Sequence, residues 1–268
     1  MASAASKRPP VYDWTGWYVG LNAGRNWGGD SVDTTASNSQ FCPICGHASA
    51  FANASIDGAT GAFPVRTDGF IGGVQFGYNW QLADRWVAGF EADLQGLAGA
   101  NSSNSRSSSA DVSGFAGHGV DTGLSVTKGI DFLGTVRGRL GFLVKPNLLV
   151  FGTGGFAYGH VKSSLAISQN FTGTGLGSLD TSIGTALNTS RMQGGWTLGG
   201  GFEWMFASKW TAKIEYLHYD LGSVTSHGQI ADRIVSPAPP TPYYFVNDVQ
   251  STTRFNGNIV RVGLNYHF

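Results

Sequence analysis

Ionisable residues at every second position are the feature of this sequence that points most clearly to chemistry. Glu91 and Asp93 are two residues apart, and so are Arg137 and Arg139. In an extended chain this spacing places both members of a pair on one face of a strand. Acids on one strand opposite bases on its neighbour would form charge-assisted hydrogen bonds. The residues predicted to share this polar face are Glu91, Asp93, Asp131, Arg137, Arg139, Glu203, Lys213, Glu215 and Arg261.

A second chemical motif is the run Cys42-Pro-Ile-Cys45-Gly-His47. It offers at most three metal ligands, whereas a structural zinc site takes about four. Redox chemistry of the thioredoxin kind would need a βαβ setting, which the neighbouring sequence lacks. We therefore expect a local disulfide between Cys42 and Cys45, as is usual in an oxidising compartment. A metal site stays open as the alternative, and no cofactor is expected.

Alternation of bulky apolar residues with small or polar ones places the charged residues on strands. From Trp17, for example, Val19 and Leu21 share one face while Gly20 and Asn22 share the other. This period of two is typical of a strand with two unlike faces. It occurs in seven segments: 17–24, 70–80, 86–95, 130–142, 192–206, 210–216 and 260–268. An eighth segment, 148–161, is assigned as a strand by its composition, because its alternation does not show which face is which. Together these segments predict an all-β fold.

The composition excludes several classes of protein. Glycine supplies 40 of 268 residues, which argues against an all-helical fold because each costs about 1 kcal/mol relative to alanine in a helix. The chain has 17 basic and 17 acidic residues, so no basic excess attracts nucleic acid. No apolar run approaches the length of a transmembrane helix.

The links between the predicted strands alternate between short and long. The short links are 82–85, 145–147 and 207–209, and the long links, rich in Ser, Gly, Asn and Thr, are 28–67, 98–128, 163–190 and 222–253. Long structureless loops are uncommon in a soluble domain, but outer-membrane barrels combine short periplasmic turns with longer extracellular loops. The prediction is therefore an eight-stranded antiparallel transmembrane β-barrel with four long extracellular loops.

The bulk of the apolar face decides which face meets lipid. An eight-stranded interior is only wide enough for side chains to fill, so the large apolar residues must point outward and the charged residues inward. Tryptophans also gather at the short-turn end, as expected at a membrane–water interface. The predicted periplasmic aromatic girdle comprises Trp17, Trp80, Trp86, Trp204 and Trp210.

The last strand carries a terminal pattern of its own. Apolar residues occupy every second position and the chain ends in phenylalanine, which resembles the C-terminal signal that the outer-membrane assembly machinery recognises. The residues of this expected assembly signal are Val260, Val262, Leu264, Tyr266 and Phe268.

The resemblance extends to other strands. The segments Trp14-Thr-Gly-Trp-Tyr-Val-Gly20, 72–80, 134–141, 152–159 and 210–222 resemble an outer-membrane barrel family of alpha-proteobacteria. Its members are described as porin-family or outer-membrane immunogenic proteins with an OmpA-type barrel. The resemblance implies export, residence in the outer membrane, and contact with its lipids, lipopolysaccharide and assembly machinery. Residues 1–13 are expected to form a periplasmic tail and residues 14–268 the barrel; a tether of the tail to peptidoglycan stays open.

Three functions remain compatible with this fold. Paired charges that plug the lumen indicate a structural barrel with exposed antigenic loops, whereas an open charged constriction would make a narrow diffusion channel. A lipid A-modifying enzyme would need a nucleophile beside a base. His218 is the candidate base, but Ser223 lies in irregular chain, and no Ser–His–acid set is evident on an outward face. We therefore expect no enzymatic activity.

Overall fold

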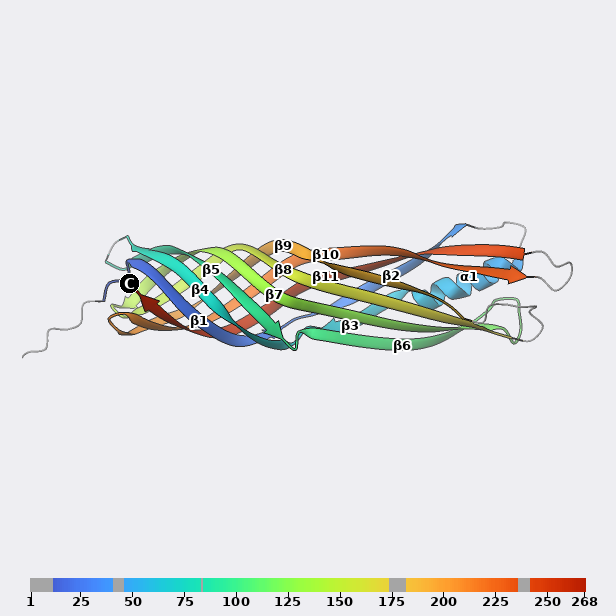
Figure 1. The fold of residues 1–268 in the computed structure, drawn as a ribbon, viewed down its shortest axis with the longest axis horizontal. Helices are drawn as coiled ribbons and strands as arrows, with labels where there is room; N and C mark the ends of the chain where they lie inside the picture. Colours follow the sequence, from blue (N-terminus) through green and yellow to red (C-terminus); the bar gives the residue numbers. More distant parts are fainter. Residues whose placement is uncertain (1–11, 41–45, 83, 174–181, 236–241) are drawn as a thin grey trace, which may run out of the picture.

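The computed structural model describes residues 12–40, 46–82, 84–173, 182–235 and 242–268. Within these residues, eleven strands and one helix build an elongated molecule (Figure 1). No helix among them is long and apolar enough to cross a bilayer. The elements are β1 (Gly16–Trp27), β2 (Gly29–Gln40), α1 (Gly46–Ala59), β3 (Gly61–Arg66), β4 (Gly69–Gln81), β5 (Trp86–Ala98), β6 (Asn101–Asp111), β7 (Gly119–Lys145), β8 (Leu148–Thr172), β9 (Ser182–Ala207), β10 (Trp210–Val235) and β11 (Pro242–His267).

The sheet closes into a ring because β1 pairs with β4 on one side and with β11 on the other. Around this ring, which we call the barrel, the strand order is β1, β4, β5, β7, β8, β9, β10 and β11, with antiparallel neighbours. Bulky apolar side chains project from its outer wall, where Leu21 is 66% exposed and Phe156 is 54% exposed. The predicted all-β antiparallel fold is confirmed.

The prediction of long loops is wrong for the described parts of the long links. These segments form β2, β3, β6, the helix α1 and the outer parts of β7 to β11. They remain extended because every second residue is still apolar, but here the apolar residues point inward. Leu165 and Ile167 are buried, for example, while Ala166 and Ser168 are exposed. The abundance of Ser, Gly and Thr hides this alternation in the sequence.

Beyond the barrel the wall divides into two facing sheets, which we call the outer sandwich. The pairing of β9 with β10 ends at Trp196 and Asp220, so each strand continues with only its other neighbour. One sheet has the order β6–β7–β8–β9 and the other β3–β2–β11–β10. Both sheets contribute to one apolar core, which includes Val32, Leu124 and Val249. At the far end α1 packs against β2, β7 and β11 (Figure 1).

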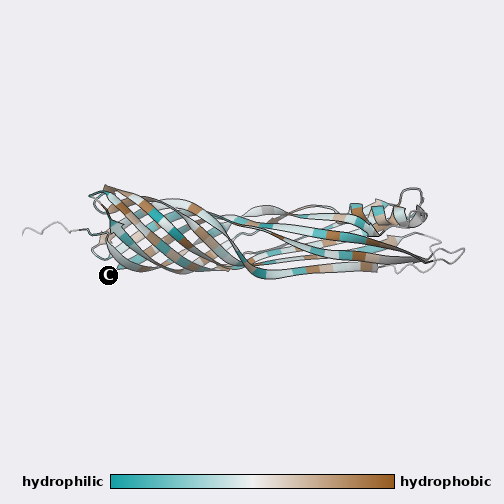
Figure 2. Ribbon diagram, turned by 90° about the horizontal axis from the view of Figure 1, so that it is seen from above, coloured by the Kyte–Doolittle hydropathy of each residue, from teal (hydrophilic) through white to brown (hydrophobic). Residues whose placement is uncertain are grey.

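A bulge in β7 marks the boundary between the two parts. The register of β7 against β8 shifts between Ile130 and Phe132, so one extra residue reverses the side-chain parity. The buried residues of β7 are odd-numbered in the barrel, such as Leu133, and even-numbered in the sandwich, such as Val126. Strongly hydrophobic and hydrophilic residues alternate along the barrel strands in Figure 2. The bulge keeps the apolar residues of β7 inside the sandwich and turns Asp131 away from the lumen.

Candidate functional site

A network of charged side chains fills the middle of the barrel. Its members are all buried, and the predicted network of buried salt bridges is therefore present. Buried ions are stable only when they are paired and hydrogen-bonded. With four acids against four bases, the network has no net charge. Its members are Glu91, Asp93, Glu203, Glu215, Arg137, Arg139, Lys213 and Arg261.

Arg137 occupies the centre of this network. It lies opposite Glu91 in the register of β5 and β7 and forms a salt bridge with that residue. Its other contacts are with Asp93, at 2.8 Å, and with Glu215 on β10, at 2.6 Å. The sequence predicted pairs between these two neighbouring strands, whereas Arg137 binds three different carboxylates and joins two sides of the barrel.

Two cations from the last strands complete this cluster. Lys213 on β10 places its Nζ 2.7 Å from Oε1 of Glu91. Arg261 on β11 places its guanidinium 2.6 Å from Glu215 and 2.9 Å from Asp93. Each of the three carboxylates that contact Arg137 therefore contacts at least one further cation. These contacts connect strands that are not neighbours in the barrel.

Arg139 reaches across the lumen rather than to the adjacent strand. Its Nη2 lies 2.6 Å from Oε2 of Glu203 on β9. Its Nη1 donates a hydrogen bond of 3.1 Å to the hydroxyl of Tyr18, which in turn donates one of 2.7 Å to Glu91. Tyr18 was not among the predicted site residues, although it shares the inward parity of Asn22 on β1 and could have been found by that signal.

Asp131 was predicted to belong to the network, and that prediction is wrong. Its carboxylate lies 2.8 Å from Nζ of Lys162 and 2.7 Å from Nδ1 of His160, and its side chain is 34% exposed. The β7 bulge explains the error. The prediction extended the alternation of Arg137 and Arg139 back to Asp131, whereas the bulge inserts one extra residue at that position.

Apolar layers enclose the network on both sides. Toward the short turns, Trp14 is fully buried, and its indole N–H donates a 3.0 Å hydrogen bond to the carbonyl of Pro146. Toward the sandwich, a second cluster includes Leu133, Leu217 and Tyr219. The sequence did not predict Trp14 as a site residue, because its role depends on the chain end folding back under the barrel. The layer around Trp14 comprises Val87, Leu143, Leu149, Phe151 and Met205.

The predicted girdle residues all lie on the outer wall. Trp17, Trp80, Trp86, Trp204 and Trp210 have exposed fractions between 40% and 52%. The predicted assembly signal lies beside them on β11 and at its end: Val260, Val262, Leu264 and Phe268 are exposed, and Tyr266 packs its ring 5.1 Å from that of Trp210. The roles of both sets remain predictions.

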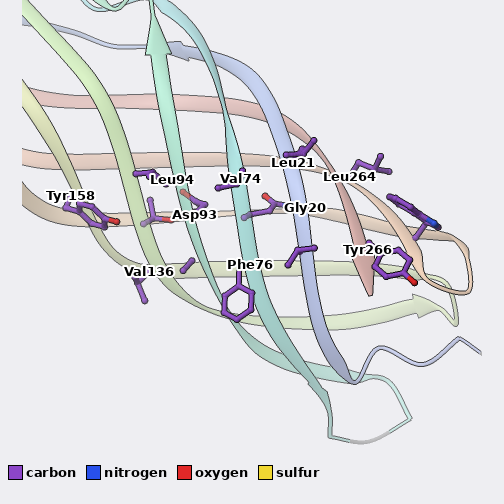
Figure 3. Close-up of a pocket in the computed structure, with 15 residues that line it drawn as sticks. Gly20, Leu21, Val74, Phe76, Asp93, Leu94, Val136, Tyr158, Leu264 and Tyr266 are labelled. Carbon is purple, nitrogen blue, oxygen red and sulfur yellow. Dashed lines mark hydrogen bonds between the residues drawn. The ribbon is translucent and has the colours of Figure 1, made fainter. Parts of the chain in front are cut away.

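An apolar groove of about 700 Å³ runs around this outer wall. In Figure 3 its lining side chains extend from Tyr158 at one end to Tyr266 at the other, across β8, β7, β5, β4, β1 and β11. Phe76 and Val136 lie along it. This groove faces outward, so it belongs to the surface that meets lipid in the predicted orientation rather than to the lumen.

The remaining predicted residues lie elsewhere. Cys42 and Cys45 are outside the described residues, and the described ranges hold no group of three or more His, Cys, Asp or Glu side chains placed for a metal. His218 contacts Asn258 at 3.0 Å. Near it, burial of Asp220 opposes its ionisation, but hydrogen bonds from Arg254 and Gly222 outweigh that effect and hold the pKa of the Asp220 carboxyl below its ordinary value.

Comparison with known proteins gives consistent matches. The family model for the outer membrane protein beta-barrel domain matches residues 1–268. The chain is 35% identical over 260 residues to the 31 kDa outer-membrane immunogenic protein of Brucella melitensis biotype 1, covering 96% of this chain and 85% of that protein. It is 32% identical over 157 residues to the 22 kDa outer membrane protein of Rhizobium leguminosarum bv. viciae, covering 59% and 55%. The crystal structure of OprG from Pseudomonas aeruginosa is similar with a TM-score of 0.39 and 9% identity, covering 97% of this chain and 98% of that one.

Proposed function

The chain belongs to the outer membrane protein beta-barrel domain family and resides in the outer membrane, and from this premise we propose that it is a closed structural barrel carrying a surface-exposed domain. Its transmembrane unit is the ring of eight strands, with the short turns toward the periplasm and the outer sandwich toward the exterior. It supports envelope integrity rather than solute passage.

The observation that carries this proposal is the neutral network of buried charges between two apolar layers. A solute crossing the lumen would have to separate these pairs, and breaking one buried pair by removing a partner costs about 3–5 kcal/mol. An eight-stranded ring also has an interior that side chains alone can fill. Both arguments favour a closed lumen over the alternative, a narrow diffusion channel.

Planar-bilayer recording of the purified, refolded protein tests the proposal. We expect no stepwise currents from wild-type protein whose folding has been verified by its heat-modifiable migration on gels. A preparation refolded without lipid or detergent serves as the control for leak. Well-defined wild-type channels whose conductance changes in Arg137→Ala would overturn the closed barrel and establish the channel instead.

The outer sandwich supports the second part of the proposal. Its outward residues are mostly small and polar. In β6 (Asn101–Asp111), for example, ten of the eleven residues are Ser, Asn, Arg or Asp, and the other is Ala110. Such a surface suits water, and the Brucella relative is named an immunogenic protein. We assign the antigenic surface of this chain to the sandwich. Expected contacts of the barrel are lipid, lipopolysaccharide and the assembly machinery. Any peptidoglycan tether would use the tail of residues 1–13, of which 1–11 lie outside the described ranges.

A further inference from the structure

Three side chains on the outer wall form a hydrogen-bonded line that a structural barrel does not require. Oδ2 of Asp131 lies 2.7 Å from Nδ1 of His160. Nε2 of the same imidazole lies 3.1 Å from Oγ of Ser190. The three residues come from the neighbouring strands β7, β8 and β9. Both distances fall within the range in which a nucleophile, a base and an orienting acid operate.

The chemistry of the three groups fixes their order. An ionised carboxylate can only accept, so Asp131 accepts a hydrogen bond from the Nδ1–H of His160. This leaves Nε2 as the acceptor for the Ser190 hydroxyl. This is the arrangement of acid, base and nucleophile found in serine hydrolases. This arrangement was not predicted from the sequence, because the alternation along residues 130–142 placed Asp131 inside the lumen.

Local structure aims these side chains at one another. The bulge in β7 turns Asp131 outward, and bulges re-aim side chains next to active sites in other proteins. Lys162 lies opposite Ser190 in the register of β8 and β9, and its Nζ is 2.8 Å from Asp131. The Lys162 ammonium therefore helps to hold the Asp131 carboxylate in place beside His160.

The position of the line relative to the apolar outer wall indicates the substrate. His160 pairs in register with Met192, which is 52% exposed, and Phe132 stacks on the imidazole with ring centroids 6.3 Å apart. Ser190 lies two residues beyond Met192, away from the short turns, and is exposed. The apolar groove of the outer wall ends at Tyr158, which precedes His160 by two residues on the same face of β8 (Figure 3). An acyl chain in the groove would place its polar end near the hydroxyl.

We propose that Ser190, His160 and Asp131 form a hydrolase site for an ester-linked acyl chain of an outer-leaflet lipid. Ser190 Oγ adds to the ester carbonyl while Nε2 of His160 takes the hydroxyl proton. The tetrahedral intermediate expels the lipid alkoxide, which receives this proton, and an acyl ester of Ser190 remains. Water then attacks the ester; His160 takes its proton and returns it to Ser190 as the fatty acid leaves.

A long-chain alkyl fluorophosphonate tests the site directly. An activated serine displaces its fluoride and forms a stable phosphonate ester, which mass spectrometry detects by the added mass. We expect refolded wild-type protein in phosphatidylcholine vesicles to be labelled at Ser190, as located by peptide mapping. Ser190→Ala should abolish this label, and His160→Asn should slow labelling by at least about 100-fold, the usual contribution of a positioned base. Fatty-acid release from phospholipid vesicles and from lipopolysaccharide, measured separately, identifies which lipid is cleaved.

Ser164→Ala is the matched control. Ser164 lies on β8 near the site, and its hydroxyl donates to Asn188 at 2.7 Å rather than to a histidine. This variant should label and hydrolyse like wild type, and heat-modifiable migration verifies that every variant is folded. Folded wild-type protein that stays unlabelled at Ser190, or His160→Asn that labels at the wild-type rate, would show that the line only stabilises the wall. Neither result bears on the conductance test of the closed barrel.

Discussion

At the scale of single residues, Arg137 is the side chain on which the interior depends most. It binds Glu91, Asp93 and Glu215, and its side chain is fully buried. Arg137→Ala would leave these three acids with fewer cations than charges. Because an unpaired buried charge is costly, we expect the free energy of unfolding to fall by about 3–5 kcal/mol. Urea titration in lipid vesicles, followed by tryptophan fluorescence, measures the change.

Arg254→Ala provides the matched control for Arg137. Arg254 also forms a salt bridge, 2.6 Å from Asp220, but its side chain is 56% exposed. Exposed ion pairs contribute about 1 kcal/mol or less, so this variant should unfold close to wild type. Equal losses of stability in the two variants would mean that burial does not distinguish the lumen network from a surface pair.

At the scale of the elements, β8 passes through two environments along its length. Phe156 projects from its barrel part and Ser168 from its sandwich part, and both side chains are exposed. A spin label at Phe156 should collide more with oxygen, which concentrates in acyl chains, than with a water-soluble nickel complex. A label at Ser168 should show the opposite preference. Power-saturation electron paramagnetic resonance of the protein in vesicles measures both.

This labelling requires a background in which Cys42 and Cys45 are replaced by serine, so that each label occupies one position. A third label at Phe76, 44% exposed on β4, serves as a second lipid-facing reference. If the labels at Phe156 and Phe76 collided mainly with the nickel complex, the apolar wall would face water, and the membrane orientation of the barrel would be wrong.

The barrel strands were predictable from sequence because their two faces differ strongly. Large apolar residues alternate with glycine and charge there, so the period of two is plain in a stretch such as Trp17 to Leu21. In the sandwich both faces are milder: Leu165 and Ile167 are separated by Ala166 and followed by Ser168. The alternation is present in these segments, but the difference in polarity between the two faces is small. For this reason they were predicted as loops although they form strands.

The site was predictable from sequence only where side chains alternate between the two faces of a strand without interruption. Arg137 and Arg139 continue an uninterrupted alternation in the barrel part of β7, and both were placed correctly in the lumen. Asp131 lies at the bulge, where one extra residue moves it to the opposite face. Its pairing with His160 and Ser190 depends on the register of three strands, which local periodicity does not specify.

At the scale of the whole molecule, the strands β7 to β11 carry opposite patterns of exposed residues in their barrel and sandwich parts. In the barrel the exposed residues are apolar and the middle of the lumen is charged, whereas in the sandwich the enclosed residues are apolar and the exposed ones polar. Burial of apolar surface from water drives folding only where water is the alternative. The change of pattern along β7 to β11 therefore indicates where the lipid ends and the external water begins.

At the same scale, the predicted assembly signal gives Phe268 an expected role in assembly of the whole molecule in the outer membrane. The Phe268 side chain is 69% exposed, while its backbone N–H donates a 3.0 Å hydrogen bond to the carbonyl of Trp17, closing the ring. Phe268→Ala keeps this hydrogen bond but removes the ring of the assembly signal. We expect less of the variant in isolated outer membranes, although its unfolding free energy after refolding in vitro should stay within about 1 kcal/mol of wild type, as for other surface substitutions.

Phe206→Ala separates the signal from the loss of an aromatic ring at the membrane interface. Phe206 lies next to the end of β9, at the same end of the barrel, and is 45% exposed. Its removal therefore costs a similar contact with lipid without altering the C-terminal strand. If recognition of the terminal residue limits assembly, Phe206→Ala reaches the outer membrane at nearly the wild-type level and Phe268→Ala does not. Equal accumulation of the two variants would assign Phe268 to the girdle alone. Recognition by the assembly machinery would then have to depend on the earlier positions of β11.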